Sequence, residues 1–294
     1  MEQQRAGIVA GLAAYIMWGS LTLFWKQLHH FSAFELIGWR ICSSVLVMVV
    51  VVTAMRRWRN VSLVLRNRRL FIRVVLAALM LTINWTSYVW AVVHDHVLET
   101  ALGYFISPLA TSLLGVFVLK ETLRAAQVVA LGLAATAVVV LTVSYGQVPW
   151  IAIGLAVSWT AYGWLKKEVP LEPVDSMTAE SLVLLVPAMI TAFALSGRAG
   201  SIPHSASGKE LTFAILTGLA TVTPLLMFAF AAKRVPLTII GPMMYIVPSI
   251  NFLLGWLAFH EDMPPSRFLG FALVWVGLAI LFGNSAHRMT RRAE

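Results

Sequence analysis

Long apolar runs, separated by charged residues, proline or glycine, dominate the pattern of this 294-residue chain. A helix needs about 20 apolar residues to cross the hydrocarbon of a bilayer, and the runs have that length. They predict ten membrane-spanning helices, at about residues 7–26, 34–55, 71–93, 98–119, 125–144, 148–166, 177–196, 210–232, 237–259 and 266–284. The sixth run is the shortest and most polar, so a nine-helix alternative omits it.

Lysine and arginine residues gather on one side of these predicted helices, which indicates their orientation. With a cytoplasmic N-terminus, 17 of the 22 basic residues fall on the cytoplasmic side: Arg5, Arg56, Arg57, Arg59, Arg66, Arg68, Arg69, Arg73, Lys120, Arg124, Lys166, Lys167, Lys233, Arg234, Arg288, Arg291 and Arg292. Four fall outside, and Arg40 lies inside the second helix. Both termini are therefore predicted to be cytoplasmic. Ten helices are favoured over nine, because nine would place the basic tail outside.

Composition narrows the class of protein. Hydrophobic residues make up 59% of the chain and charged residues 12%, against roughly 45–50% and about 25% in soluble domains. We expect a multi-pass protein of the inner membrane with no soluble catalytic domain, no cofactor and no nucleic-acid partner. The net charge of +9 comes from residues that flank apolar runs. Membrane lipids and a small-molecule substrate are the expected partners of a monomer or weak homodimer.

One stretch of the chain is repeated: residues 104–121 align without gaps on residues 244–261. A Leu-Leu pair coincides in the two segments. The other matched pairs are Pro108 with Pro248, Gly115 with Gly255, and Glu121 with Glu261. The fourth and ninth predicted helices are therefore equivalents.

The repeat divides the chain into halves of five helices each, residues 1–146 and 147–294. More weakly, Trp18-Gly19 of the first helix matches Tyr162-Gly163 of the sixth. Because five is an odd number, the second half enters the membrane from the opposite side. The predicted fold is thus an all-α integral membrane protein with two inverted five-helix repeats, an architecture that allows secondary transporters to open a central site to each side in turn.

Residues 84–109, which include Asn84, Trp85, Tyr88 and Tyr104, strongly resemble the signature of RarD proteins, in the EamA group of the drug/metabolite transporter superfamily. The likeness continues along the chain at Ala14-Tyr15, Trp18-Gly19, Glu35, Arg40, Leu155-Ala156, Ser158, Tyr162-Gly163, Thr223-Pro224-Leu225-Leu226, Tyr245, Pro248 and Glu261. The resemblance implies a ten-helix, exporter-like carrier whose family name derives from chloramphenicol sensitivity. Departures at Trp39, Val93, Ser107 and Met244 mean that no relative's substrate can be carried over.

Prolines inside predicted helices indicate where a substrate site lies. A proline frees a backbone carbonyl, which is tolerated in a membrane only where protein or water satisfies it. Pro108 and Pro248 hold matching positions, and Pro224 adds a third break. The alternative for any one of them is a kink that serves packing. The matching pair favours a substrate site near the midplane.

Aromatic and small polar side chains surround these breaks. The candidates are Tyr15, Trp18, Asn84, Trp85, Tyr88, Tyr104, Ser107, Ser158, Tyr162, Thr223, Tyr245 and Asn251. Aromatic faces with a few hydroxyls and amides suit an amphipathic organic solute, such as an amino acid or a chloramphenicol-like compound. Interfacial belts and contacts between helices are the alternative role for about half of such residues.

Ionisable residues near the predicted outer mouth are candidates for gating or coupling. Glu35 and Arg40 belong to the second helix, and their interaction would either hold a gate closed or anchor the helix. His94, His96 and Glu99 follow on the turn after the third helix. This turn lacks the His-x-x-x-His spacing of a helical zinc site, so an outer gate or helix cap is favoured over a metal. No Asp or Glu lies at the centre of a span, which argues against a deep carboxylate relay.

The sequence therefore favours a secondary transporter, an exporter or exchanger of a small organic solute. One alternative is a carrier or scramblase of lipid or lipid-linked substrates with the same architecture, which would show a lateral polar groove. A membrane enzyme is a third class, but it would need clustered catalytic groups, and only the turn at His94 hints at them.

Overall fold

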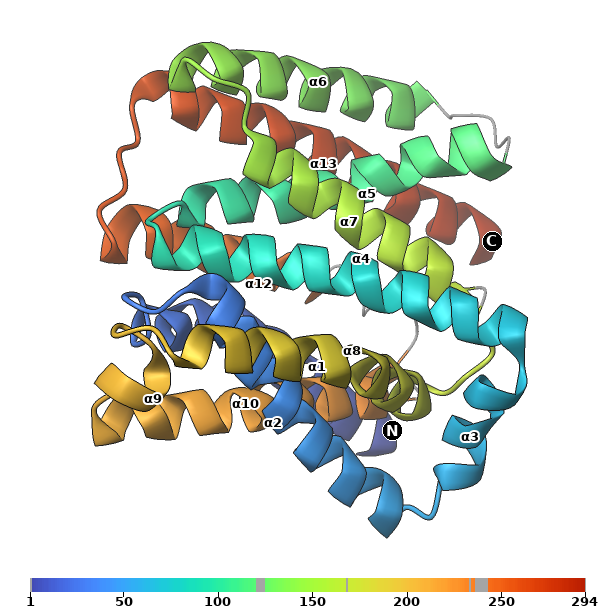
Figure 1. Ribbon diagram of the computed structural model, residues 1–294. Helices are drawn as coiled ribbons and strands as arrows, with labels where there is room; N and C mark the ends of the chain where they lie inside the picture. Colours follow the sequence, from blue (N-terminus) through green and yellow to red (C-terminus); the bar gives the residue numbers. More distant parts are fainter. Residues whose placement is uncertain (1, 120–124, 168, 233, 236–242, 294) are drawn as a thin grey trace.

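The computed structural model describes residues 2–119, 125–167, 169–232, 234–235 and 243–293, and helices make up nearly all of it (Figure 1). The ten predicted spans correspond to α1 (Glu2–Lys26), α2 (Ala33–Ala54), α4 (Arg68–Val93), α5 (Val97–Leu119), α6 (Ala125–Tyr145), α7 (Trp150–Lys167), α8 (Pro173–Ser196), α10 (Gly208–Ala232), α12 (Ile246–Leu253) with the π-helical turn η1 (Leu254–Ala258), and α13 (Pro265–Ala293). The predicted all-helical class is confirmed.

The surface of these helices is that of a membrane protein. Large apolar side chains face outward on several of them, and Phe193 and Val143 are 84% and 78% exposed. Within the described residues, five helices are long and apolar enough to cross a bilayer: Glu2–Lys26, Ala33–Ala54, Arg68–Val93, Pro173–Ser196 and Gly208–Ala231. Val128–Ser144, Ile246–Ala258 and Pro265–Ile280 form shorter apolar helical stretches.

Two short helices were not predicted, α3 (Trp58–Arg66) and α9 (Ile202–Ser205). The α3 helix lies in the basic segment between the second and third predicted spans, where no helix was expected. It forms there because Val61 and Val64, three residues apart, occupy one helical face and are buried. The arginines of α3 remain on its exposed side.

The helices pack in pairs that the two repeats make equivalent. Each of α2, α5 and α6 contacts its own counterpart, which is α8, α12 and α13 respectively. The contact of α1 with α10 has its equivalent in that of α7 with α4, and the contact of α1 with α12 in that of α7 with α5. This pairing is what two inverted repeats predict. A central core of buried apolar residues joins α1, α2, α4, α7 and α8.

Glycines allow some of these helices to approach closely. A Cβ on Gly19 of α1 would lie 2.8 Å from Ile250 of α12, and one on Gly103 of α5 would lie 2.8 Å from the carbonyl oxygen of Ala152 of α7. The two contacts lie in equivalent helix pairs, α1 with α12 and α7 with α5, although they involve different positions of the repeat. The closest approach is at Gly218 of α10, where a Cβ would lie 2.3 Å from the carbonyl carbon of Ser43 of α2.

The prolines differ from the expected symmetric breaks. Pro108 and Pro224 lie inside α5 and α10, whereas Pro248 lies in the first turn of α12. A first-turn proline costs no helical hydrogen bond, because that N–H has no partner within the helix. Glu121, the sequence counterpart of Glu261, lies outside the described residues.

For orientation we name two ends of the molecule. The Lys26 end holds the connections at residues 27–32, 94–96, 146–149, 197–207 and 259–264, and the Arg57 end holds residues 55–67 and 169–172. In Figure 1, α9 marks the Lys26 end and α3 the Arg57 end.

Candidate functional site

A chain of polar side chains connects four helices inside the bundle, toward the Lys26 end. Thr22 of α1 donates from Oγ1 to Oδ1 of Asn251 on α12 at 2.8 Å and lies 2.8 Å from the hydroxyl of Tyr88 on α4. Asn251 donates from Nδ2 to Oγ1 of Thr100 on α5 at 3.4 Å. Thr22, Thr100 and Asn251 have no exposed surface. Tyr88 and Asn251 were predicted from the sequence as binding residues, and the two threonines were not.

Asn84 of α4 is the centre of a second, adjoining network. Its Nδ2 donates to the carbonyl oxygen of Leu155 at 3.1 Å and to Oγ of Ser158 at 3.0 Å, both on α7. Its Oδ1 accepts from the hydroxyl of Tyr104 on α5 at 3.1 Å. Three of the predicted binding residues thus satisfy one another across the two halves of the chain.

Arg40 of α2 lies beside these networks. Its guanidinium carbon is 3.9 Å from the ring centre of Trp85 and 5.5 Å from that of Trp25. It lies within electrostatic range of the Tyr88 and Tyr104 hydroxyls. Only 4% of Arg40 is exposed, and no hydrogen bond or ion pair between described residues involves its guanidinium.

Glu35, which the sequence placed as a possible partner of Arg40, has a different one. Its Oε1 accepts from the backbone N–H of Ile202 at 2.8 Å, so it holds the start of α9 against α2. Among the described residues no ion pair joins Glu35 to Arg40, in keeping with their five-residue separation on one helix. Anchoring, the second role considered for Glu35, fits this contact.

The remaining aromatic candidates lie toward the Arg57 end. Tyr15 and Trp18 of α1 contact each other at 5.5 Å between ring centres, and both contact Phe228 of α10. Tyr245 stacks on Phe105, 6.4 Å away. Trp18, Thr223 and Tyr245 are half-buried. In the polar networks, by contrast, Thr22, Asn84, Thr100 and Asn251 have no exposed surface.

Ser107 is turned into its own helix, where its hydroxyl donates to the carbonyl oxygen of Gly103 at 2.9 Å. Pro224 and Pro248 are buried, and Pro108 is half-buried. Ser107 and the three prolines therefore act on the local geometry of α5, α10 and α12, next to the polar networks.

A buried ionic cluster on α8 was not predicted from the sequence. The Glu180 carboxylate, 1% exposed, accepts hydrogen bonds from Lys166 Nζ at 2.6 Å, from Ser176 Oγ at 2.8 Å and from the Tyr162 hydroxyl at 3.1 Å. Glu180 follows Arg40 by 140 residues, the offset that also relates Pro108 to Pro248. A buried carboxylate thus lies two turns inside α8, near the start of the predicted span 177–196 and not at its centre. The 140-residue offset of the repeat, applied to Arg40, could have identified Glu180 from the sequence.

A second ionic contact ties α3 to α8 at the Arg57 end. Arg57 donates from Nε and Nη2 to the two carboxylate oxygens of Asp175, each at 2.7 Å, and Asn60 adds a bond of 3.0 Å. These hydrogen bonds raise the pKa of Arg57. Bidentate pairing of this kind fixes direction as well as distance, so the α2–α3 connection is held against α8.

The turn at His94 is held by contacts within the protein. Asp95 has a positive φ of 62° and forms an ion pair with Lys26 of α1. His94 stacks on Trp90, and His96 Nδ1 lies 3.1 Å from Glu99. No group of three or more His, Cys, Asp or Glu residues that could hold a metal occurs in the part of the chain that the structure describes.

Glu261 closes the same region from the other half of the chain. Its carboxylate accepts from the backbone N–H of Val97 at 2.6 Å and of Leu98 at 2.9 Å, and so caps α5. Burial raises the pKa of Glu261, and these two N–H groups oppose that rise. A polar pocket of about 430 Å³ lies beside it, lined by Asp95, His96, Glu99, Gln147, Phe259, His260, Glu261, Asp262 and Arg267.

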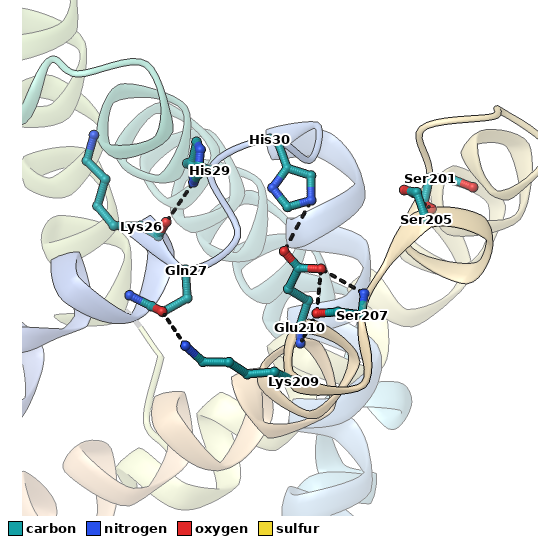
Figure 2. Close-up of polar contacts among 9 residues, drawn as sticks. All are labelled: Lys26, Gln27, His29, His30, Ser201, Ser205, Ser207, Lys209 and Glu210. Atoms are coloured by element: carbon teal, nitrogen blue, oxygen red, sulfur yellow. Dashed lines mark hydrogen bonds and ion pairs between the residues drawn. The ribbon is translucent and has the colours of Figure 1, made fainter.

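Figure 2 shows further contacts at the Lys26 end, where the α1–α2 connection meets the start of α10. His30 Nε2 lies 3.3 Å from Glu210 Oε1, and Lys209 donates to Gln27 at 3.1 Å. Glu210 also accepts from the backbone N–H of Ser207 at 2.7 Å, which caps α10. Several loops are thus joined at this end by polar contacts.

A lateral groove of about 360 Å³ lies between α2, α4 and α8. Apolar side chains line most of it, with four hydroxyl-bearing residues among them. These are Thr82, Thr86, Ser87 and Thr191.

Helices with apolar outer faces, packed as two equivalent sets around buried polar networks, define a multi-pass membrane protein of the transporter class. The model of the EamA-like transporter family matches the chain twice, over residues 5–143 and 148–283. The chain belongs to this family.

Similar proteins span the whole chain. Protein RarD of Streptomyces exfoliatus is 42% identical over 100% of this chain and 93% of its own length. The uncharacterized transporter YojE of Bacillus subtilis is 34% identical over 99% and 98%, and the chloramphenicol-sensitive protein RarD of Pseudomonas aeruginosa is 22% identical over 100% and 99%. One solved crystal structure, 19% identical, covers 99% of both chains with a TM-score of 0.58, which shows a shared fold. The resemblance to RarD proteins is confirmed, and the family is one of transporters rather than enzymes.

Proposed function

We propose that this protein is a secondary carrier that moves a small organic solute across the inner membrane by alternating access. The observation that carries the proposal is the polar chain Thr22–Tyr88 and Thr22–Asn251–Thr100, which joins α1, α4 and α5 of the first half to α12 of the second. Polar groups inside a membrane protein are costly, and they mark substrate pathways.

The proposed solute site lies between this chain and the half-buried aromatic residues Trp18 and Tyr245. Fully buried polar side chains close the bundle toward the Lys26 end, whereas the aromatic residues toward the Arg57 end keep part of their surface. That difference is expected of a carrier closed on one side. An amphipathic or aromatic solute, such as an amino acid or a chloramphenicol-like compound, suits these walls.

Ligand-dependent stability tests the proposal. The purified protein in detergent is heated with amino acids, nucleobases, aromatic amines or chloramphenicol, because a ligand that binds only the folded state raises the unfolding midpoint. We expect one chemical class to raise the midpoint and Asn84→Ala to remove the shift. Thr136→Ala is the matched control, since Thr136 is exposed and bonds only within its own helix. If no compound of the panel raises the unfolding midpoint of monodisperse protein, the result would count against a small-solute carrier.

The lateral groove supports a second candidate, a carrier or scramblase of lipids. Its hydroxyl groups lie on faces of α4 and α8 that a lipid headgroup could follow. Reconstituted vesicles with a fluorescent phospholipid would distinguish the two: we expect no scrambling above protein-free vesicles, and rapid scrambling lost on Thr86→Leu would favour the lipid candidate.

A further inference from the structure

Arg40 presents an unusual electrostatic situation for a residue inside a membrane protein. It carries a full positive charge with 4% exposure. Its Nε is buried and has no hydrogen-bond partner. A buried guanidinium normally has a carboxylate or several carbonyl oxygens around it, because desolvation is costly. Here its close neighbours are the rings of Trp85 and Trp25.

Two more buried donors without partners lie near this group. Ser44 is one helical turn from Arg40 on α2, so the two side chains share a face, and its Oγ has no partner. Trp25, whose ring lies 5.5 Å from the guanidinium carbon, has an unpartnered Nε1. Arg40 and Ser44 of α2 and Trp25 of α1 therefore each have a buried polar side-chain atom without a hydrogen-bond partner.

The acidic residue closest in sequence cannot supply that acceptor. Glu35 uses its Oε1 to hold the backbone N–H of Ile202. The electrostatic neighbours of Arg40 are the neutral hydroxyls of Tyr88 and Tyr104. What the region lacks is an acceptor with negative charge.

We propose that Arg40 binds the carboxylate of the transported solute, with Ser44 and Trp25 as additional donors and Trp85 as an aromatic wall. This inference rests on the proposed carrier function and names its substrate class, a small organic carboxylate with an apolar or aromatic body. A guanidinium matches a carboxylate with two parallel hydrogen bonds. One positive charge balances one carboxylate, whereas a phosphate carries nearly two negative charges at neutral pH.

The neighbouring networks suit the rest of such a solute. Tyr88 and Tyr104 lie within electrostatic range of Arg40, and each belongs to one of the two polar networks. A carboxylate that binds Arg40 is therefore close to Tyr88 of α4 and Tyr104 of α5, whose networks reach α12 and α7. Binding at Arg40 is thus coupled to the contacts that close the Lys26 end.

Matched probes that differ only in charge test the proposal. Phenylacetate, phenylacetamide and benzylamine are added separately to the purified protein, and the unfolding midpoint and the dissociation constant are measured. We expect phenylacetate to stabilise the protein and its neutral amide to have little effect. Inorganic phosphate is a further probe, and a shift equal to that of phenylacetate would overturn the carboxylate assignment in favour of a general anion site.

Variants locate the binding group. We expect Arg40→Gln to weaken phenylacetate binding at least about tenfold, the loss expected for a charge-assisted hydrogen bond, and Arg40→Lys to retain part of it. Arg66→Gln, on the exposed face of α3, is the matched control with the same charge change and should leave binding unaltered. Each shift is measured from the variant's own ligand-free midpoint. If Arg40→Gln does not fold, the comparison of phenylacetate with phenylacetamide in the native protein decides.

The outcomes separate this inference from the carrier proposal. Stabilisation by benzylamine or phenylacetamide alone, or a phenylacetate shift that survives Arg40→Gln, would overturn the carboxylate site and leave the carrier intact. If none of the three probes shifts the unfolding midpoint at millimolar concentration, the carboxylate site is also overturned. The carrier proposal fails separately, if Thr100 never becomes accessible from the Lys26 end.

Discussion

Individual polar residues hold the interior of this protein together. Asn84 satisfies both ends of its amide with partners on α5 and α7, and Thr22 links α1 to α4 and α12. Inside a membrane, a polar group that lacks a hydrogen-bond partner is costly, because lipid offers no substitute. These contacts between helices therefore stabilise the fold.

Replacement of Asn84 tests the first network. Asn84→Ala leaves the hydroxyl of Tyr104 without its acceptor and Ser158 without one donor, so we expect a loss of about 1–3 kcal/mol in unfolding free energy. Unfolding of purified protein in detergent measures it. Thr136→Ala, which removes only an exposed bond within α6, should change stability little. If the two substitutions change the free energy of unfolding equally, the Asn84 network does not stabilise the fold.

The Glu180 cluster makes a separate prediction. Glu180→Gln leaves the Lys166 ammonium, 25% exposed, without its anion, and Lys166→Met leaves a buried carboxylate. We expect each single variant to be destabilised and the double variant to be more stable than their sum predicts, with a coupling of about 0.5–3 kcal/mol. A double-mutant cycle of unfolding measures this coupling, and strict additivity would rule it out.

Residue roles were only partly predictable from the sequence. Asn84, Tyr88, Tyr104 and Asn251 were identified because aromatic and amide side chains near the proline breaks suit an amphipathic organic solute. Thr22 and Thr100 were not, since a threonine in a helix often bonds only to its own backbone. Glu180 was missed as a site because it follows the charged start of the seventh span, where acidic residues usually cap a helix.

Among the elements, the spans were predictable and their ends and contacts were not. Apolar runs of spanning length correspond to ten helical segments, because the bilayer dictates their length. The short α3 escaped notice, since its two buried valines are too few to stand out among the arginines. Pro248 was expected in the middle of a helix, but the place where α12 begins depends on packing rather than on the repeat.

Close contact between α2 and α10 can be tested with one glycine. Gly218→Val would place a side chain against the Ser43 backbone, which cannot move aside, so we expect a loss of at least about 1–3 kcal/mol and a smaller monodisperse fraction. Gly132→Val is the matched control, because nothing lies within 4 Å of its Cβ position. If both variants purify and unfold like the native protein, the close approach is not needed.

At the scale of the whole molecule, the two halves form one bundle through equivalent helix pairs. The family model matches residues 5–143 and 148–283, which agrees with the sequence repeat. The connections at the Arg57 end contain the arginines Arg56, Arg57, Arg59 and Arg66, whereas those at the Lys26 end contain one, Arg198. We therefore propose that the Arg57 end is cytoplasmic, together with both termini.

Cysteine labelling tests this orientation. In a Cys42→Ser background, we expect Arg198→Cys, at the Lys26 end, to react with a membrane-impermeant maleimide in intact cells. Arg66→Cys, on the exposed face of α3, should react only after permeabilisation. The reverse pattern would require an inverted topology.

The most direct test of alternating access is the accessibility of Thr100 from the Lys26 end. Thr100 has no exposed surface in this structure and belongs to the polar chain that closes that end. The measurement is the rate at which Thr100→Cys, in the Cys42→Ser background, reacts with an impermeant maleimide applied to the Lys26 face. Ala137→Cys, equally buried where α6 packs against α13, is the control. Our account predicts slow but complete labelling of Thr100→Cys and none of Ala137→Cys; equal resistance of both would contradict it.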